Sequence, residues 1–249
     1  MAVKLYSLPV SHPALAVKGM LAHKGMQARV VEIVPGFQPL LRTIGFPGYT
    51  VPALVLGRIK VQGSRTIAQA LETVRPEPPL FPRDPEARLR VEEAERWGEE
   101  VLQEVPRRIF RWSIAHEYEV RRWLAEDVSR VPGGAAIARP PLQARLFARA
   151  AGASDAAVRA DVAALGDHLA EVERLRAEGV IGGASPNAAD FQIASSVRSL
   201  EGIGDLAPYL ADHPAVRWAA GVLPELPGPV PPALPREWLA PLEGLRAAA

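Results

Sequence analysis

The sequence has 249 residues with 29 basic and 28 acidic side chains, and 48% of its residues are hydrophobic. This composition supports one large or two small folded domains. It lacks the basic excess that is typical of a nucleic-acid-binding protein, so we expect no nucleic-acid partner.

Cysteine is absent, which excludes disulfides, thiolate metal sites and a cysteine nucleophile. The histidines are scattered along the chain, so we expect no metal site. No apolar run approaches the roughly 20 residues that cross a bilayer, and the opening MAVKLYSL is unlike a signal peptide. We therefore expect a cytoplasmic protein with no membrane partner.

The first 76 residues predict a small α+β domain. Short segments rich in β-formers are bounded by proline and glycine, at 3–8, 28–33, 53–57 and 59–63. A helical pattern at 14–26 separates the first two segments, which favours a parallel pair of strands. The last two segments read as a hairpin, and a helix is expected at 64–74 with Ser64 as its N-cap.

A proline-rich segment then leads into a helical region. It contains five prolines without periodicity between Arg75 and Ala87, as expected of a linker. We predict a first domain at 1–76, a linker at 77–87 and an all-helical domain at 88–249 with a proline-rich C-terminal tail.

Helical spacing is clear throughout the second domain. Up to about residue 127 the pattern supports two long helices or one helix kinked at Pro106. Further helices are predicted at 140–151, 154–178, 187–200, 214–222 and 236–247.

Polar motifs stand where predicted strands and helices begin or end. Ser11, in PVSHPAL, follows the first strand; it is the working hydroxyl of a site, a helix N-cap or an incidental serine. Val51-Pro52 opens a later strand. An X-Pro bond is cis in roughly 5% of folded cases, so the alternative is a trans proline that only starts the strand.

Two more motifs lie at helix starts. The N–H groups around Ser64 suit a carboxylate or phosphate, although a plain N-cap without a ligand has the same signature. Asn187 followed by Asp190 resembles a capping box. We expect these two residues to nucleate a buried helix, with a structural rather than a catalytic role for Asp190.

In this order, and around a proline-rich linker, the motifs resemble the glutathione transferase family over about residues 3–222. The similarity is to serine-type, theta- or zeta-like bacterial members. VPAL is similar to the family's cis-proline segment, GSRTIAQALE to its glutathione-anchoring turn and NAADFQIA to its buried capping box. The resemblance implies a thioredoxin-like α+β N-terminal domain of βαβ-ββα order with a mixed four-stranded sheet, followed by an all-α domain. It also implies glutathione as co-substrate, no metal, a homodimer and a detoxifying transfer to a small hydrophobic electrophile.

The resemblance also implies roles for particular residues. Ser11 matches the serine whose hydroxyl donates to the glutathione thiolate, and such a bond lowers the pKa of a thiol; Ser7 and Tyr6 are weaker candidates. Val51 would pair its backbone with the cysteinyl part of glutathione, and Ser64 would hold the γ-glutamyl carboxylate. The other implied glutathione contacts are Pro52, Gln62, Arg65 and Arg42. Candidates for the second-substrate pocket are His12, Arg107, Arg108, Trp112 and Tyr118, with Trp112 equally a core residue.

The sequence departs from the family pattern at Gly63, where an acid usually precedes the serine. That acid commonly meets the glutathione amino group, and charge-assisted hydrogen bonds are roughly twice as strong as neutral ones. Gln62, another residue or a partner subunit would have to replace it, or glutathione binds weakly. Two alternatives therefore stay open: a non-catalytic ligand- or protein-binding module on the same fold, and an enzyme that uses another thiol or none.

Overall fold

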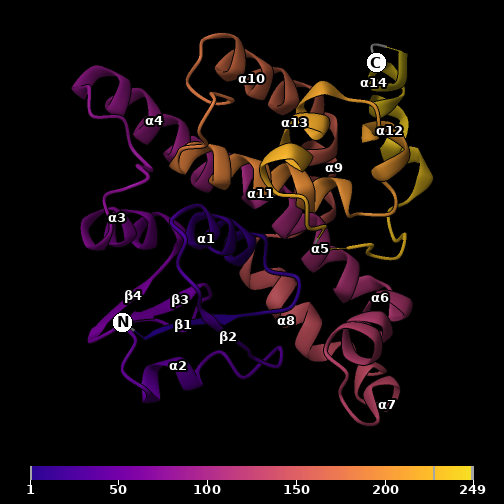
Figure 1. The fold of residues 1–249 in the computed structure, drawn as a ribbon. Coiled ribbons are helices and arrows are strands. Elements are labelled where there is room, and N and C mark those ends of the chain that lie inside the picture. Colours follow the sequence, from indigo (N-terminus) through magenta and orange to yellow (C-terminus); the bar gives the residue numbers. More distant parts are fainter. Residues whose placement is uncertain (1, 227, 248–249) are drawn as a thin grey trace.

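The computed structural model describes residues 2–226 and 228–247 (Figure 1). Its N-terminal part follows the predicted order of strands and helices. The elements are β1 Val3–Ser7, α1 His12–His23, β2 Arg29–Glu32, α2 Leu40–Thr43, β3 Ala53–Leu56, β4 Ile59–Gln62 and α3 Ser64–Val74. Only α2 was not predicted, because a helix of 4 residues is too short to show a helical period.

The strands form one mixed sheet in the order β2-β1-β3-β4. β1 and β2 are parallel, whereas β3 runs antiparallel to both β1 and β4. Val3 and Leu5 point toward α1 and α3 and join the main core. Tyr6 points to the opposite face, where it packs with Leu41 of α2 and with Phe46. Two helices thus cover one face of the sheet and α2 lies on the other (Figure 1), which confirms the predicted α+β domain.

The rest of the described chain is helical, as predicted. The first group is α4 Pro85–Trp97, a π-helical turn η1 Gly98–Leu102, α5 Glu104–His116, α6 Tyr118–Trp123, a second π-helical turn η2 Leu124–Val128, α7 Gly134–Ala138 and α8 Leu142–Ala150. The second group is α9 Asp155–Ala163, α10 Leu165–Ala177, α11 Ala188–Glu201, α12 Ala207–Leu210, α13 Pro214–Val222, a 3-10 helix η3 Arg236–Leu242 and α14 Glu243–Ala247.

Two predicted helices are interrupted. The helix expected at 154–178 is divided at Ala164 between α9 and α10. The chain before α5 changes to a π-helical turn at Gly98, where a Cβ would lie 3.0 Å from Ile193 Cγ1 on α11. The interruption ends at Gln103, and Pro106 lies in the first turn of α5, where the backbone N–H that proline lacks is not needed by the helix.

The segment between α3 and α4 is packed against both parts of the molecule. Leu80 and Phe81 are buried, and the C=O of Leu80 accepts a hydrogen bond from the N–H of Ala188 at 2.8 Å. The last residues of the linker predicted at 77–87 already belong to α4, which begins at Pro85.

One continuous apolar core joins the sheet, α1 and α3 to the helices that follow. α1 lies between the sheet and α11 (Figure 1), and the approach is close: a Cβ on Gly19 would lie 2.5 Å from Leu223 Cδ2. After α1, the buried Lys24 donates from Nζ to Glu72 Oε2 at 2.5 Å and to the C=O of Arg75 at 2.6 Å. α1 is therefore fixed between the two parts. Among the described residues, no helix has both the length and the apolarity that a membrane span requires.

Candidate functional site

Three of the sequence motifs meet at one edge of the sheet. Ser11 follows β1, Val51 lies just before β3, and Ser64 follows β4. Ala53, the first residue of β3, pairs with a residue near the end of β1 and with the last residue of β4. Because both pairings are antiparallel, the end of β1, the start of β3 and the end of β4 lie side by side. We call this edge, with Ser11, Val51 and Ser64, the motif edge.

Ser11 is the N-cap of α1. Its Oγ accepts a hydrogen bond from the backbone N–H of Ala14 at 3.3 Å. The cap uses an oxygen lone pair and leaves the hydroxyl hydrogen free to donate. The helix also directs its positive end toward this position. The N-cap reading and the working-hydroxyl reading of Ser11 are therefore compatible.

The two weaker candidates for the thiol-binding hydroxyl are engaged elsewhere. Ser7 is buried, and its Oγ donates to the C=O of Leu8 at 2.9 Å. The ring of Tyr6 packs edge-on against Phe46 with centroids 5.7 Å apart, on the α2 side of the sheet. Neither hydroxyl competes with Ser11 for the motif edge.

The Val51–Pro52 peptide bond is cis, as in the segment that it resembles. The C=O of Pro52 accepts a hydrogen bond from the N–H of Gly63 at 3.0 Å, which ties β3 to the start of α3. Among the described residues, neither the N–H nor the C=O of Val51 has a hydrogen-bond partner. A free backbone segment of this kind suits pairing with an extended peptide.

Ser64 is the first residue of α3, which corrects the prediction that it is the N-cap. Gly63 holds the N-cap position with φ of 90°, where glycine is strongly favoured over residues with a side chain. Ser64 is 1% exposed, and within the described chain its Oγ has no hydrogen-bond partner. A buried hydroxyl beside the N–H groups of a helix start is well suited to bind a carboxylate.

A buried acid that the sequence did not reveal lies close by, on α4. Glu95 Oε2 is 3.6 Å from Nε of Arg65, the residue after Ser64. Glu95 is 1% exposed, and this burial raises the pKa of its carboxyl to about 8, although the charge of Arg65 opposes the shift. In the described part of the chain, neither carboxyl oxygen of Glu95 has a hydrogen-bond partner. The run VEEAERWGEE resembles a solvated acidic face, so only the packing of α4 shows that Glu95 differs from its neighbours.

The other side chains implied to contact glutathione are Gln62, Arg65 and Arg42, and each has a different environment. The amide of Gln62 fixes the loop before β3, because Oε1 accepts from the N–H of Gly48 at 2.7 Å and Nε2 donates to the C=O of Thr50 at 2.5 Å. Arg65 is shared between Glu95 and Glu99 of α4. Arg42 is exposed on α2.

His12 is the first residue of α1, and its side chain is buried in the protein instead of lying at the rim of a pocket. This burial, aided by the charge of Arg107, lowers the pKa of the ring to about 3 while a hydrogen bond with the backbone of Gln103 opposes the shift. The ring is therefore neutral near pH 7. Nε2 of His12 has no hydrogen-bond partner among the described residues. This histidine connects the motif edge to the first turns of α5.

Three of the expected pocket residues turn toward other helices. Arg108 donates from Nε and Nη2 to the carboxylate of Asp161 on α9, both at 2.6 Å. Trp112 is buried; its Nε1 donates to Asp155 Oδ1 at 2.8 Å. The hydroxyl of Tyr118 donates to a backbone carbonyl of α7 at 3.4 Å. Their polar atoms are thus used inside the helical part, away from the motif edge.

Asn187 and Asp190 form a capping box at the start of α11. The side chain of Asn187 accepts from the N–H of Asp190 at 3.1 Å, and Asp190 Oδ2 accepts from the N–H of Asn187 at 2.8 Å. Asp190 Oδ1 also accepts from the N–H of Gly182 at 2.7 Å. Burial raises the pKa of Asp190, and the two N–H donors oppose that shift.

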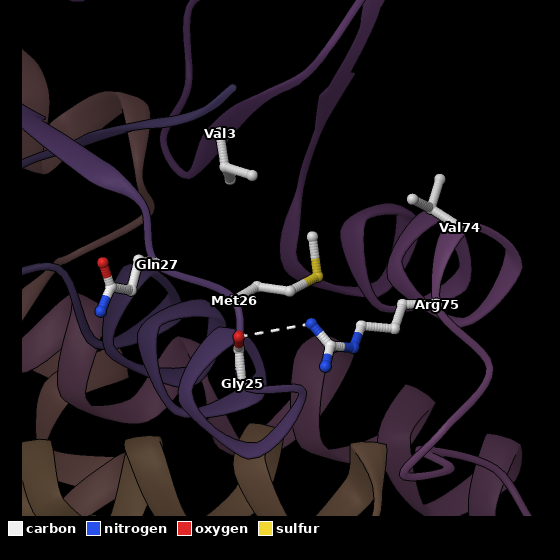
Figure 2. Close-up of a pocket in the computed structure, with 6 residues that line it drawn as sticks. All are labelled: Val3, Gly25, Met26, Gln27, Val74 and Arg75. Atoms are coloured by element: carbon white, nitrogen blue, oxygen red, sulfur yellow. Dashed lines mark hydrogen bonds between the residues drawn. The ribbon is translucent and has the colours of Figure 1, made fainter. Parts of the chain in front are cut away.

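Two surface cavities lie away from the motif edge. One of about 430 Å³ is at the opposite edge of the sheet (Figure 2), lined by Val3, Gly25, Met26, Gln27, Val74 and Arg75. Arg75 Nη1 donates across it to the C=O of Gly25 at 3.3 Å. Another, of about 350 Å³, is formed by α1, α11 and residues 222–225. Neither is lined by Ser11, Val51 or Ser64. Within residues 2–226 and 228–247, no three histidine or acidic side chains gather closely enough to hold a metal ion.

Comparison with known proteins agrees with the fold. Residues 5–79 match the family described as glutathione S-transferase, N-terminal domain, whereas no curated protein matches the sequence. A glutathione S-transferase from Rhodospirillum rubrum F11 is 22% identical with a TM-score of 0.59, covering 96% of this chain and 99% of that one. A β-etherase from Sphingobium sp. strain SYK-6 is 18% identical with a TM-score of 0.62, covering 100% of both chains.

A third solved structure is a maleylacetoacetate isomerase from Anaeromyxobacter dehalogenans 2CP-1, which holds dicarboxyethyl glutathione and citrate in its active site. It is 23% identical, with a TM-score of 0.54 over 95% of this chain and 96% of that one. At these identities the likeness shows a shared fold, with a thioredoxin-like N-terminal domain followed by a helical domain.

Proposed function

We propose that this protein is a glutathione-dependent enzyme, because residues 5–79 match the N-terminal domain of glutathione S-transferases and the whole chain shares the fold of solved glutathione S-transferases. It binds glutathione as a thiolate and transfers it to a small hydrophobic electrophile. One observation carries the proposal: a free hydroxyl at Ser11, a free backbone at Val51 and an unpartnered Oγ at Ser64 share the motif edge among the described residues.

Two groups at the motif edge hold the peptide part of glutathione. The N–H and C=O of Val51 pair with the cysteinyl backbone, as a strand edge pairs with an extended peptide. Ser64 Oγ and the N–H groups at the start of α3 bind the γ-glutamyl carboxylate, which the positive end of the helix also favours.

Glu95 takes the place of the acid that is missing at Gly63. The γ-glutamyl group carries an ammonium beside its carboxylate, and a cation needs an anionic partner when it leaves water. Glu95 reaches the start of α3 from α4, and its carboxyl oxygens have no hydrogen-bond partner in the described chain. A bound ammonium favours the ionised carboxylate and lowers its raised pKa.

Ser11 supports the reactive thiolate. Its hydroxyl donates a hydrogen bond to the sulfur, and the positive end of α1 adds to this stabilisation. Both favour the charged form and lower the thiol pKa. In the transfer, the sulfur forms a bond to the electrophilic carbon, the leaving group departs with its electron pair, and the thiol proton goes to solvent.

The motivation for a second candidate function is Gly63. Gly63 stands where an acid would precede Ser64. If Glu95 does not replace that acid, the chain would act as a ligand- or protein-binding module. Relatives of this fold include a β-etherase and an isomerase, so a glutathione-dependent reaction other than conjugation belongs to the same proposal. We expect a homodimer on the resemblance alone.

The proposal is tested by comparing Ser11→Ala with Ser154→Ala, using chlorodinitrobenzene and glutathione. Ser154 caps α9 as Ser11 caps α1, with Oγ accepting from the N–H of Ala157 at 3.2 Å, so both variants lose one cap. We expect kcat/KM to fall about tenfold or more in Ser11→Ala only, because about 1.4 kcal/mol of thiolate stabilisation is lost. The apparent pKa of the bound thiol should rise in the same variant, and Ser11→Thr should retain activity. Full activity in Ser11→Ala would refute the role of Ser11.

A further inference from the structure

α5 carries an arginine pair on the side that faces the start of α1. Glu104, Arg107 and Arg111 are spaced as i, i+3 and i+7 and therefore share one face of the helix. The charge of Arg107 acts on the ring of His12, the residue that follows Ser11, so this face lies near the start of α1. Arg108, the next residue, points to the other side and pairs with Asp161.

The charges on this face are unbalanced. Arg107 forms an ion pair with Glu104, which leaves the guanidinium of Arg111 without an acid of its own. Among residues 2–226 and 228–247, no carboxylate lies within salt-bridge distance of Arg111. Its hydrogen bond is a long one, from Nη1 to the C=O of Phe147 at 3.4 Å. His12 adds no charge because its ring stays neutral, so the face keeps an excess positive charge.

The environment of Arg111 disfavours an unpaired cation. Burial lowers the pKa of its guanidinium, the nearby charge of Arg107 lowers it further, and Glu104 only partly opposes this. A guanidinium nevertheless stays charged in proteins. Arg111 would therefore be stabilised by an anion, and a carboxylate fits its two parallel N–H groups.

The helix that Arg111 contacts, α8, exposes apolar side chains. Phe147, whose carbonyl Arg111 contacts, is 42% exposed, and Leu146 is 60% exposed. α8 lies between α5 and β2 (Figure 1), and Gln143 touches the loop after β2, where a Cβ on Gly36 would be 3.1 Å from its Nε2. A molecule bound here would meet a cation at one end and apolar surface beside it.

We propose that Arg111, with Arg107 beside it, binds a carboxylate of the second substrate, so that the electrophile is an organic acid with an apolar body. This inference rests on the proposed function and names the substrate class of the same site. Arg111 holds the acid while the thiolate near Ser11 attacks the electrophilic carbon.

The test uses two electrophiles that differ in one charge, para-chloro-meta-nitrobenzoate and the corresponding benzamide. In both, the carbon–sulfur bond forms and chloride leaves with the bonding electrons. Binding is measured by calorimetry without glutathione, and kcat/KM is measured with it. The proteins are the wild type, Arg111→Gln, Arg111→Lys and the control Arg58→Gln, which removes the same charge from an exposed turn at the opposite edge of the sheet.

We expect the wild type and Arg58→Gln to prefer the acid over the amide by about tenfold or more, the scale of one charge-assisted contact. Arg111→Gln should lose this preference, and Arg111→Lys should keep part of it, chiefly as a change in KM. Equal binding of the two probes by the wild type, no binding of the acid, or an unchanged preference in Arg111→Gln would overturn the inference. If Arg111→Gln does not fold, a preference in Arg111→Lys equal to that of the wild type would count against it in the same way.

The outcomes separate the two proposals. Preferential binding of the acid without glutathione-dependent turnover would contradict the proposed function and leave the role of Arg111 intact. Glutathione-dependent turnover of both probes with equal kcat/KM would contradict the role of Arg111 and leave the proposed function intact.

Discussion

Two buried titratable side chains flank the motif edge, and burial displaces their pKa values in opposite directions. Glu95 has a pKa raised to about 8, so the folded protein holds its proton more tightly than the unfolded chain does. Its contribution to stability is therefore lost as pH rises from about 4.5 toward 8. His12 has a pKa lowered to about 3, so its contribution is lost as pH falls from about 6.5 toward 3.

Glu95→Gln should remove the alkaline half of this pH dependence. A glutamine keeps the shape of the side chain and does not ionise, so the variant avoids a cost on the order of 4 kcal/mol that wild type incurs by pH 8. Urea denaturation at pH 5 and pH 8 measures the difference in unfolding free energy. The control is Glu93→Gln, which changes an exposed acid on the same helix. An identical pH dependence in wild type and Glu95→Gln would show that Glu95 is not a buried acid.

At the scale of elements, α11 depends on its N-terminal cap. Its residues are almost all buried, and Asp190 accepts from two backbone N–H groups, those of Gly182 and Asn187. Removing this buried carboxylate breaks two charge-assisted hydrogen bonds at once, to the N–H groups of Gly182 and Asn187, which is a larger loss than that of one exposed cap.

Asp190→Ala should therefore lower the unfolding free energy by about 2–4 kcal/mol, measured by urea denaturation. Asp84→Ala is the matched control, because Asp84 caps α4 in an exposed position and accepts from the N–H of Ala87 at 2.8 Å. We expect that variant to lose about 1 kcal/mol. Equal losses of unfolding free energy in the two variants would mean that the Asp190 cap stabilises the protein no more than an exposed cap does.

The elements also show what the sequence can predict. α3 at 64–74 and α13 at 214–222 have the predicted bounds, because amphipathic spacing and clear end signals mark both helices. The break at Ala164 lies two residues before Gly166; because an isolated glycine is tolerated inside a helical pattern, the helical spacing on both sides predicted one helix through this point. The sequence predicted the three segments of the motif edge because each has a serine or a proline where a strand or helix begins or ends.

Residues whose role depends on tertiary contacts were not predictable. Glu95 and Arg111 lie in charged helical runs that resemble solvent-facing surfaces, and their burial or lack of partners appears only when the helices are packed. Arg108 and Trp112 were expected at a second-substrate pocket, but Asp161 and Asp155 of α9 bind their polar atoms. The spacing of residues in the sequence predicts which side chains share one face of a helix. It does not predict which other helix or strand that face contacts.

At the scale of the whole molecule, the proposed glutathione site draws on both parts of the chain. Val51, just before β3, and Ser64 of α3 come from the first part, while α4 of the second part contributes Glu95, which lies close to Arg65. The continuous core and the close approach of α1 to α11 hold this geometry. We therefore expect the affinity for glutathione to depend on residues from both sides of the segment that follows α3.

The most direct test of this account is a calorimetric titration of the purified protein with glutathione, with Ser64→Ala and Glu95→Gln alongside. We predict binding in the micromolar to low-millimolar range, abolished in Ser64→Ala and weakened about tenfold or more in Glu95→Gln, which loses a charged partner of the ammonium. No heat at several millimolar glutathione, from a protein that circular dichroism shows to be folded, would contradict the central claim. The fold would then serve another thiol or a protein partner.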